Sequence, residues 1–159
     1  MATANPAKKI APSEGQLDAF LDKYNPAIAQ LARECLRKMR TRLPGAVQLV
    51  YDNYNALAIG FGPSERASEA IFSIALYPRW VTLFFLQGVG LPDPERLLKG
   101  SGKVVRHIVL ASASDLDLPA IQDLMAHALR RAEAGIDPAA PGKLVIRSVS
   151  AKQRPRRPA

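Results

Sequence analysis

The stretch VQLVYDNYNALAIGFG, residues 47–62, sets the architecture of this chain. It holds two strand-length runs, 47–53 and 55–62, which are rich in β-branched and aromatic residues. Two more runs of the same kind follow at 70–77 and 80–87, with no helical pattern between them. Successive short strands without intervening helices predict an antiparallel meander.

The second of these strands has one face made of small residues. Its large apolar residues alternate with Ala56, Ala58 and Gly60. A face this small lets a helix or a ligand approach the sheet closely. A covering helix is the ordinary explanation, and a ligand pocket is the alternative that the sequence leaves open.

Helical periodicity is present on both sides of this strand-rich region. A capping box at Ser13 opens a short helix that ends near Tyr24. Pro26 then opens a second helix, whose apolar stripe continues to Leu43. A long amphipathic helix begins near Pro119, in the last third of the chain.

A fifth strand is predicted at 104–112, with a candidate final strand at 143–150. The predicted fold class is therefore α+β: an antiparallel sheet of about five strands, with the N-terminal helix pair and the long C-terminal helix packed on it. A length of 159 residues suits one domain. We place it at 13–150, between a flexible N-terminus (1–12) and a disordered basic tail (151–159).

The net charge of +8 comes from the two ends of the chain. Residues 1–12 contain two lysines, residues 143–159 contain six lysines and arginines, and neither segment has an acidic residue. The tail has too few apolar residues to offset the entropy of ordering, so we predict that it is disordered. It either solubilises the protein or makes a weak, salt-sensitive contact to a polyanion through Arg154, Arg156 and Arg157.

Composition points to a cytoplasmic setting. No run reaches the roughly 18 consecutive apolar residues that a membrane span needs, so we predict no membrane association. The first residues lack the apolar run of a secretory signal. Cys35 is the single cysteine and cannot form an internal disulfide, which favours a reducing compartment.

The segment GSGK, residues 100–103, looks like a phosphate-binding loop but fails the test for one. A Walker loop has a glycine separated by four residues from its Gly-Lys pair, and a hydroxyl residue after the pair. Leu97 and Val104 occupy these two places, and a strand follows where a helix should open. The sequence therefore predicts a glycine-rich turn, which is either purely structural or holds a small anion with its amides and Lys103.

No catalytic or metal-binding set is evident in the sequence. His107 and His127 lack the spacing of zinc ligands, and Cys35 lies on the apolar stripe of a helix. The carboxylates at 93–95 and 115–117 would suit a hard cation, but they suit helix caps and loops equally well. We therefore predict no cofactor and favour a binding protein over an enzyme.

The run FFLQGVGLPDPERLLKGSGKVVRHIVLASASDLD, residues 84–117, resembles the YdhG-like family of small bacterial domains of unknown function. The residues that carry the resemblance are Gly88, Leu91, Asp93, Pro94, Leu97, Leu98, Gly100, Gly102, Lys103 and Arg106. The resemblance covers roughly residues 26–134 and implies an α+β domain with an antiparallel sheet and flanking helices. Some relatives are labelled frataxin-like iron carriers, although the family motif is not a ligand set.

The main functional hypothesis is a small anionic or polar ligand bound at the sheet, with a homodimer as a further expectation. The candidate ligand-binding residues are Gly100, Gly102, Lys103, Arg106, Arg79, Tyr51 and Asp52. Two alternatives stay open. One is a basic-tailed adaptor that binds nucleic acid or an acidic protein, and the other is an iron carrier.

Overall fold

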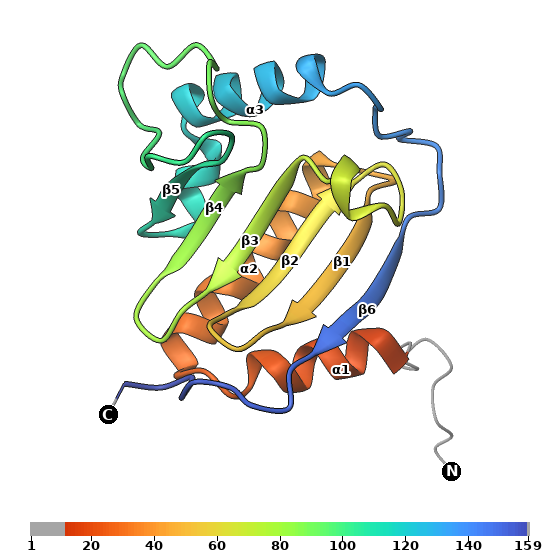
Figure 1. Cartoon of the computed structure of the whole chain (residues 1–159), viewed down its shortest axis with the longest axis vertical. Coiled ribbons are helices and arrows are strands. Elements are labelled where there is room, and N and C mark those ends of the chain that lie inside the picture. The colour runs from red at the N-terminus through yellow and green to blue at the C-terminus, as the bar shows by residue number, and fades with distance from the viewer. Residues whose placement is uncertain (1–11, 159) are drawn as a thin grey trace.

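The computed structural model describes residues 12–158 as a six-stranded sheet with three α-helices (Figure 1). The helices are α1 (Pro12–Leu21), α2 (Pro26–Arg42) and α3 (Pro119–Arg131). The strands are β1 (Val47–Asp52), β2 (Leu57–Gly62), β3 (Phe72–Leu76), β4 (Val81–Phe85), β5 (Arg106–Leu110) and β6 (Lys143–Val149). Two short 3₁₀ turns are η2 (Ala67–Glu69) and η3 (Ala113–Asp117). The predicted flexible N-terminus lies, except for Pro12, outside the described residues.

The sheet has the strand order β5-β4-β3-β2-β1-β6. Strands β1 to β5 form an antiparallel meander, and β6 pairs with β1 in parallel. The α+β class is thus confirmed, whereas the prediction of a purely antiparallel sheet of about five strands is wrong. The direction of β6 depends on where the chain re-enters the sheet after α3, and no local pattern encodes that path.

The connection 132–142 carries the chain from α3 back to the β1 edge of the sheet (Figure 1). It passes closely over Gly45, which has φ +84°. A β-carbon at Gly45 would lie 1.9 Å from the carbonyl oxygen of Asp137. Only glycine fits this position, because it supplies both the left-handed backbone and the space for the crossing chain.

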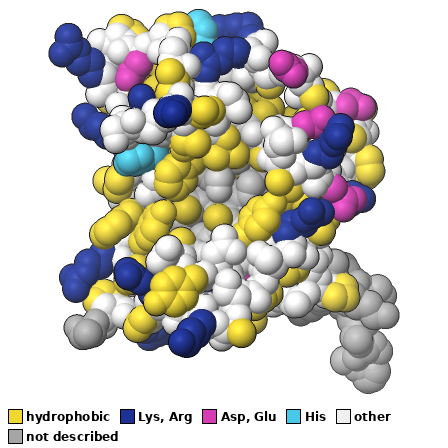
Figure 2. Space-filling view, in the orientation of Figure 1, with side chains coloured by type: hydrophobic (Ala, Val, Ile, Leu, Met, Phe, Trp, Pro, Cys, Tyr) yellow, Lys and Arg dark blue, Asp and Glu magenta, His cyan; other side chains and the backbone are white. Residues whose placement is uncertain are grey.

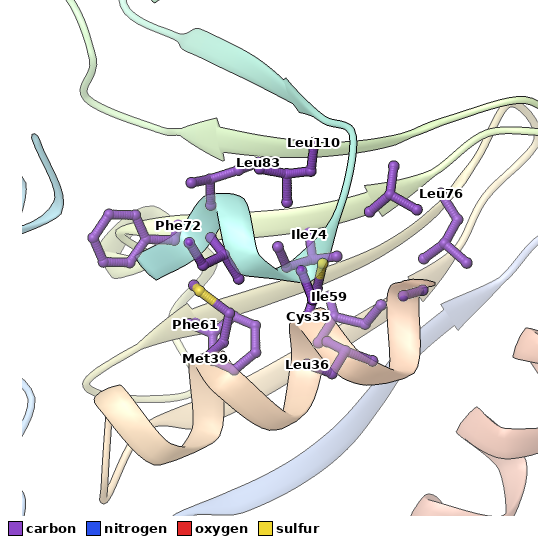
Figure 3. Close-up of a cluster of buried hydrophobic side chains, with 14 of the residues drawn as sticks. Cys35, Leu36, Met39, Ile59, Phe61, Phe72, Ile74, Leu76, Leu83 and Leu110 are labelled. Atoms are coloured by element: carbon purple, nitrogen blue, oxygen red, sulfur yellow. The ribbon is translucent and has the colours of Figure 1, made fainter. Parts of the chain in front are cut away.

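One face of the sheet packs on α2, which lies behind the strands in Figure 1. Cross-strand pairing aligns Val50, Ile59, Ile74, Leu83 and Ile108 on this face. The buried stripe of α2 includes Cys35, Leu36 and Met39, which meet the apolar side chains of β2 and β3 (Figure 3). The face of the sheet that carries the large apolar side chains therefore supplies the hydrophobic core.

Helices α1 and α3 extend this core at opposite ends of the molecule (Figure 1). Helix α1 contacts β6, and α3 contacts η3. Leu17 and Leu21 of α1 are buried in the same cluster as Ile121 and Leu124 of α3. None of the helices in residues 12–158 has the length and apolar character needed to cross a membrane.

The opposite face of the sheet is open, and within residues 12–158 no helix covers it (Figure 1). Its central row pairs Ala58 with Ala75, and Ala75 with Thr82. The expectation that a helix covers the small face of β2 is therefore wrong. The helices pack on the other face because Leu57, Ile59 and Phe61 offer more apolar area there.

Candidate functional site

The open face of the sheet is hollowed at its centre, and hydrophobic side chains gather around the hollow (Figure 2). The volume of the hollow is about 630 Å³. Its lining residues come from β2, β3, β4 and the adjoining loops and are Asn53, Tyr54, Asn55, Ala56, Ala58, Ser73, Ala75, Tyr77, Phe84, Leu86, Val105 and Ser150. A hollow of this size suits a small organic molecule.

Small side chains on the two central strands form the floor of the hollow. The open face of β2 carries Ala58 and Gly60, which pair with Ala75 and Ser73 of β3. Ala75 is only 3% exposed and Ser73 only 8% exposed, although no helix lies over them. The floor is therefore sunk between bulkier neighbours, as the alternation of small residues along these strands dictates.

Aromatic side chains form much of the rim. Tyr77 stacks on Trp80 of the β3–β4 turn, with ring centroids 5.4 Å apart. Phe84 meets His107 of β5, with centroids 5.6 Å apart. Tyr54, in the turn between β1 and β2, is 47% exposed. Rigid aromatic groups around a small-residue floor provide apolar contact area without a large loss of side-chain entropy on binding.

The lining of the hollow carries no charged side chain. Its polar groups are the amides of Asn53 and Asn55, the hydroxyls of Ser73 and Ser150, and the phenols of Tyr54 and Tyr77. Burial raises the pKa of Tyr77, so this phenol remains a neutral donor at physiological pH. The hollow can therefore form hydrogen bonds to a ligand, but its lining holds no acid–base pair for proton transfer.

The structure separates the sequence-predicted site residues into two groups. Asp52 aligns with Leu57 and Leu76 at the end of the sheet that also holds the turn with Arg79. Arg106 pairs with Phe85 at the opposite end. The predicted cluster around Lys103 and Arg79 is thus not formed, because the β3–β4 hairpin and the loop before β5 lie at different ends of β4.

The glycine-rich turn precedes a strand, β5, so no helix opens after GSGK. Gly100 has φ +117°, and Gly102 and Lys103 are exposed. The guanidinium of Arg106 turns back on this loop and donates to the carbonyls of Gly102 (2.6 Å) and Val105 (2.8 Å). Arg106 therefore braces its own loop. Of residues 100–106, Val105 alone lines the hollow.

Tyr51 and Asp52 lie on opposite faces of β1. Tyr51 pairs with Ala58 in the open-face row but does not line the hollow. The side chain of Asp52 is fully buried and binds Lys23 (2.6 Å) and Arg156 (2.8 Å). Burial alone would raise the pKa of Asp52, but hydrogen bonds from Lys23, Gln153 and Arg156 outweigh it and hold this pKa below its ordinary value. Asp52 therefore serves an internal ion pair.

The structure differs from the expected disordered tail. Residues 151–158 follow a defined path along the lower edge of the sheet in Figure 1, and Arg156 is only 6% exposed. Composition does not reveal this path, because the segment is held by contacts to residues far away in the sequence, among them the buried ion pair of Arg156 with Asp52. Arg156 is not available to a polyanion in this arrangement, whereas Arg154 and Arg157 are exposed.

Burial decides the protonation state of Cys35, and the spacing of possible ligands bears on the metal alternatives. Burial raises the pKa of the Cys35 thiol to about 12, so this cysteine remains protonated within the core. Within residues 12–158, no three histidine, cysteine or carboxylate side chains come together as a metal site. The iron-carrier alternative therefore has no candidate ligand cluster in this part of the chain.

Comparison with protein-family models, curated proteins and solved structures finds no match for this chain. The resemblance of residues 84–117 to the YdhG-like family therefore stays a prediction.

Sequence reasoning found part of the hollow and missed the rest. The small residues of β2 gave the floor, and Asn53 and Tyr54 lie next to the predicted pair Tyr51 and Asp52. Ser73 and Ala75 carry the same signal, since small residues alternate with large ones in the run 70–77. The contribution of Ser150 had no local signal, because it depends on the pairing of β6 with β1.

Proposed function

We propose that this domain binds a small organic ligand in the hollow on the open face of its sheet. The observation that carries the proposal is the sunken floor of Ala58, Ser73 and Ala75 beneath an aromatic rim. Its volume of about 630 Å³ lies within the range of roughly 300–1,000 Å³ that is usual for ligand pockets. Such a site is concave, mainly apolar and fitted with a few polar groups.

The lining supports a ligand with a flat apolar body and polar substituents. The aromatic rim would contact the body, and the amides and hydroxyls would fix its orientation. Arg154 lies over the ring of Tyr54, with its guanidinium carbon 5.7 Å from the ring centroid. An anionic substituent at this rim would therefore meet a cation, which agrees with the expectation of a polar or anionic ligand.

The proposal is tested with the fluorescent probe 1-anilinonaphthalene-8-sulfonate, which has a flat apolar body and an anionic group. The full chain should bind the probe with a saturable rise in fluorescence. Ala58→Phe should reduce the affinity at least about tenfold, because the added ring fills the floor of the hollow. Ala19→Phe, on the exposed side of α1, is the matched control and should bind like the parent chain.

Equal probe binding by the two variants would contradict the proposal. The alternative occupant of the hollow is a second copy of the chain, and sedimentation velocity of the same samples tests for it. A dimer in the parent protein that Ala58→Phe dissociates and Ala19→Phe preserves would assign the hollow to self-association and overturn the small-ligand assignment.

A further inference from the structure

The guanidinium of Arg156 lies in a built pocket at the edge of the sheet. Its Nη2 donates to the carboxylate of Asp52 (2.8 Å) and to the carbonyl of Asn53 (2.5 Å). Its Nη1 donates to the carbonyl of Tyr54 (3.4 Å). The ring of Tyr24 lies 5.7 Å from the guanidinium carbon. The pocket is thus made entirely by residues 24–54, far from Arg156 in the sequence.

The acceptors of this pocket suit a guanidinium better than another cation. One carboxylate oxygen and two carbonyl oxygens receive hydrogen bonds from its two terminal nitrogens. A planar guanidinium offers several donors in a fixed arrangement and also stacks favourably on an aromatic ring. An ammonium group is a point charge without this planar shape, so it would satisfy fewer of these partners.

The pocket keeps its charge balance when the arginine leaves. Asp52 is also paired with Lys23, whose side chain comes from the segment between α1 and α2 and is 39% exposed. One buried carboxylate therefore serves two cations, and Lys23 alone would neutralise it. Tyr24 is likewise held without the tail, because its hydroxyl donates to the carbonyl of Leu76 and accepts from the amide of Leu57.

Arg156 is the buried anchor of a superficial segment, which Gln153 and Arg157 also hold through side-chain hydrogen bonds near its surface. Its neighbours Arg154, Pro155 and Arg157 are exposed. The segment is otherwise held by a few polar contacts, such as the bond from the amide of Arg154 to the carbonyl of Tyr54 (2.9 Å). The Nε of Arg156 is buried without a hydrogen-bond partner, so even the anchor is not fully satisfied.

We propose that Asp52, Tyr24 and the carbonyls of Asn53 and Tyr54 form an arginine-binding site, which the C-terminal segment fills as a detachable internal ligand. The partner class is an extended basic peptide that inserts one arginine between exposed neighbours. The intact chain favours its own arginine, because a tethered ligand has a high effective concentration. A peptide binds readily once this internal arginine is removed.

The test uses the full chain and a fluorescent peptide with the sequence SAKQRPRRPA, which repeats residues 150–159. Fluorescence anisotropy measures its binding to the parent chain and to Arg156→Gln. The variant should bind the peptide at least about tenfold more tightly than the parent chain, whose site is filled. Lys152→Gln is the matched control. It removes one positive charge from an exposed residue of the same segment and should behave like the parent chain.

Specificity for the arginine is tested with a second peptide that carries the Arg156→Gln change. The Arg156→Gln chain should bind this peptide at least about tenfold more weakly than the unmodified one. Equal binding of the two peptides would show only a general attraction between charges and would overturn the proposal. Equal binding by the parent chain and the Arg156→Gln chain would also overturn it, because the cis arginine would then not occupy the site.

A second measurement covers the case in which Arg156→Gln fails to fold. Hydrogen exchange of the Arg154 amide, which is bonded to Tyr54, is followed in the parent chain with added N-acetyl-arginine amide. Exchange should accelerate relative to the same concentration of N-acetyl-lysine amide, because the free guanidinium displaces the tail. Identical exchange with the two compounds would refute the proposal.

Discussion

The glycine-rich loop before β5 and the C-terminal segment are both basic, yet the structure treats them in opposite ways. Lys103 of the loop is exposed, and Arg106 binds carbonyls of its own loop. Arg156 of the tail is buried and binds Asp52, which lies 104 residues earlier. The glycine-rich loop, whose sequence looks like a binding motif, is a local turn. The C-terminal segment, which has no such motif, contributes the arginine of the buried ion pair.

The difference shows what decides whether a cation is structural. Glycines and a lysine in a row determine local backbone freedom but provide no partner. A single carboxylate on the buried face of β1 provides one, and its field is strong because water is excluded around it. Three experiments examine this contrast, beginning with the site where the largest change is expected.

The largest effect is expected for Asp52→Ala. The change removes the buried carboxylate that accepts hydrogen bonds from Lys23 and Arg156, so the free energy of unfolding should fall by about 1.5–3 kcal/mol. Urea unfolding measures the loss. Asp117→Ala is the control, since it also removes a carboxylate shared by two cations, Lys38 and Arg42, but at a half-exposed position. A loss at Asp52 no larger than that at Asp117 would remove the distinction between the two regions.

A smaller change in the free energy of unfolding is expected when the pH is lowered. Because partners hold the pKa of Asp52 below its ordinary value, its contribution to stability is present above that ordinary value of about 4 and is lost as the pH falls through the folded-state pKa. The difference in unfolding free energy between the parent chain and Asp52→Asn should stay constant from about pH 5 to 8 and shrink below pH 4. Urea unfolding across this range measures it. A difference that grows in acid would contradict the assigned ion pair.

The smallest effect is expected in the loop. Lys103→Ala should change the free energy of unfolding by less than about 0.5 kcal/mol, because its side chain is exposed. Binding of the fluorescent probe in the hollow should also stay unchanged, because Lys103 does not line it. A marked loss of stability or of probe binding would show that Lys103 has a structural partner, as Arg156 has Asp52.

Much of the fold could be predicted from local patterns. The runs at 47–53, 55–62, 70–77 and 80–87 each contain the strand expected of them. The predicted fifth strand at 104–112 contains β5, in which Ile108 and Leu110 are buried while Val109 is 51% exposed. These predictions succeeded because side-chain periodicity depends only on neighbouring residues.

The candidate site was harder to predict because its parts meet only across the sheet. Alternating small residues signalled the floor at Ala58, but the choice between a helix and an open hollow depended on which face α2 covers. Two of the candidate residues, Lys103 and Arg79, do not come together at one site. The β3–β4 hairpin precedes β4 and the glycine-rich loop follows it, so the order of these segments along the chain already places them at opposite ends of the strand.

The sequence by itself determined the helices, the antiparallel meander and the small face of β2, since each follows from the spacing of apolar residues along a short segment. The tertiary structure decided the parallel pairing of β6, the hollow on the open face and the burial of Arg156. The pairing of β6 and the burial of Arg156 depend on contacts between segments roughly 100 residues apart, such as Val47 with Lys143 and Asp52 with Arg156. Their formation depends on chain path and burial, which composition does not reveal.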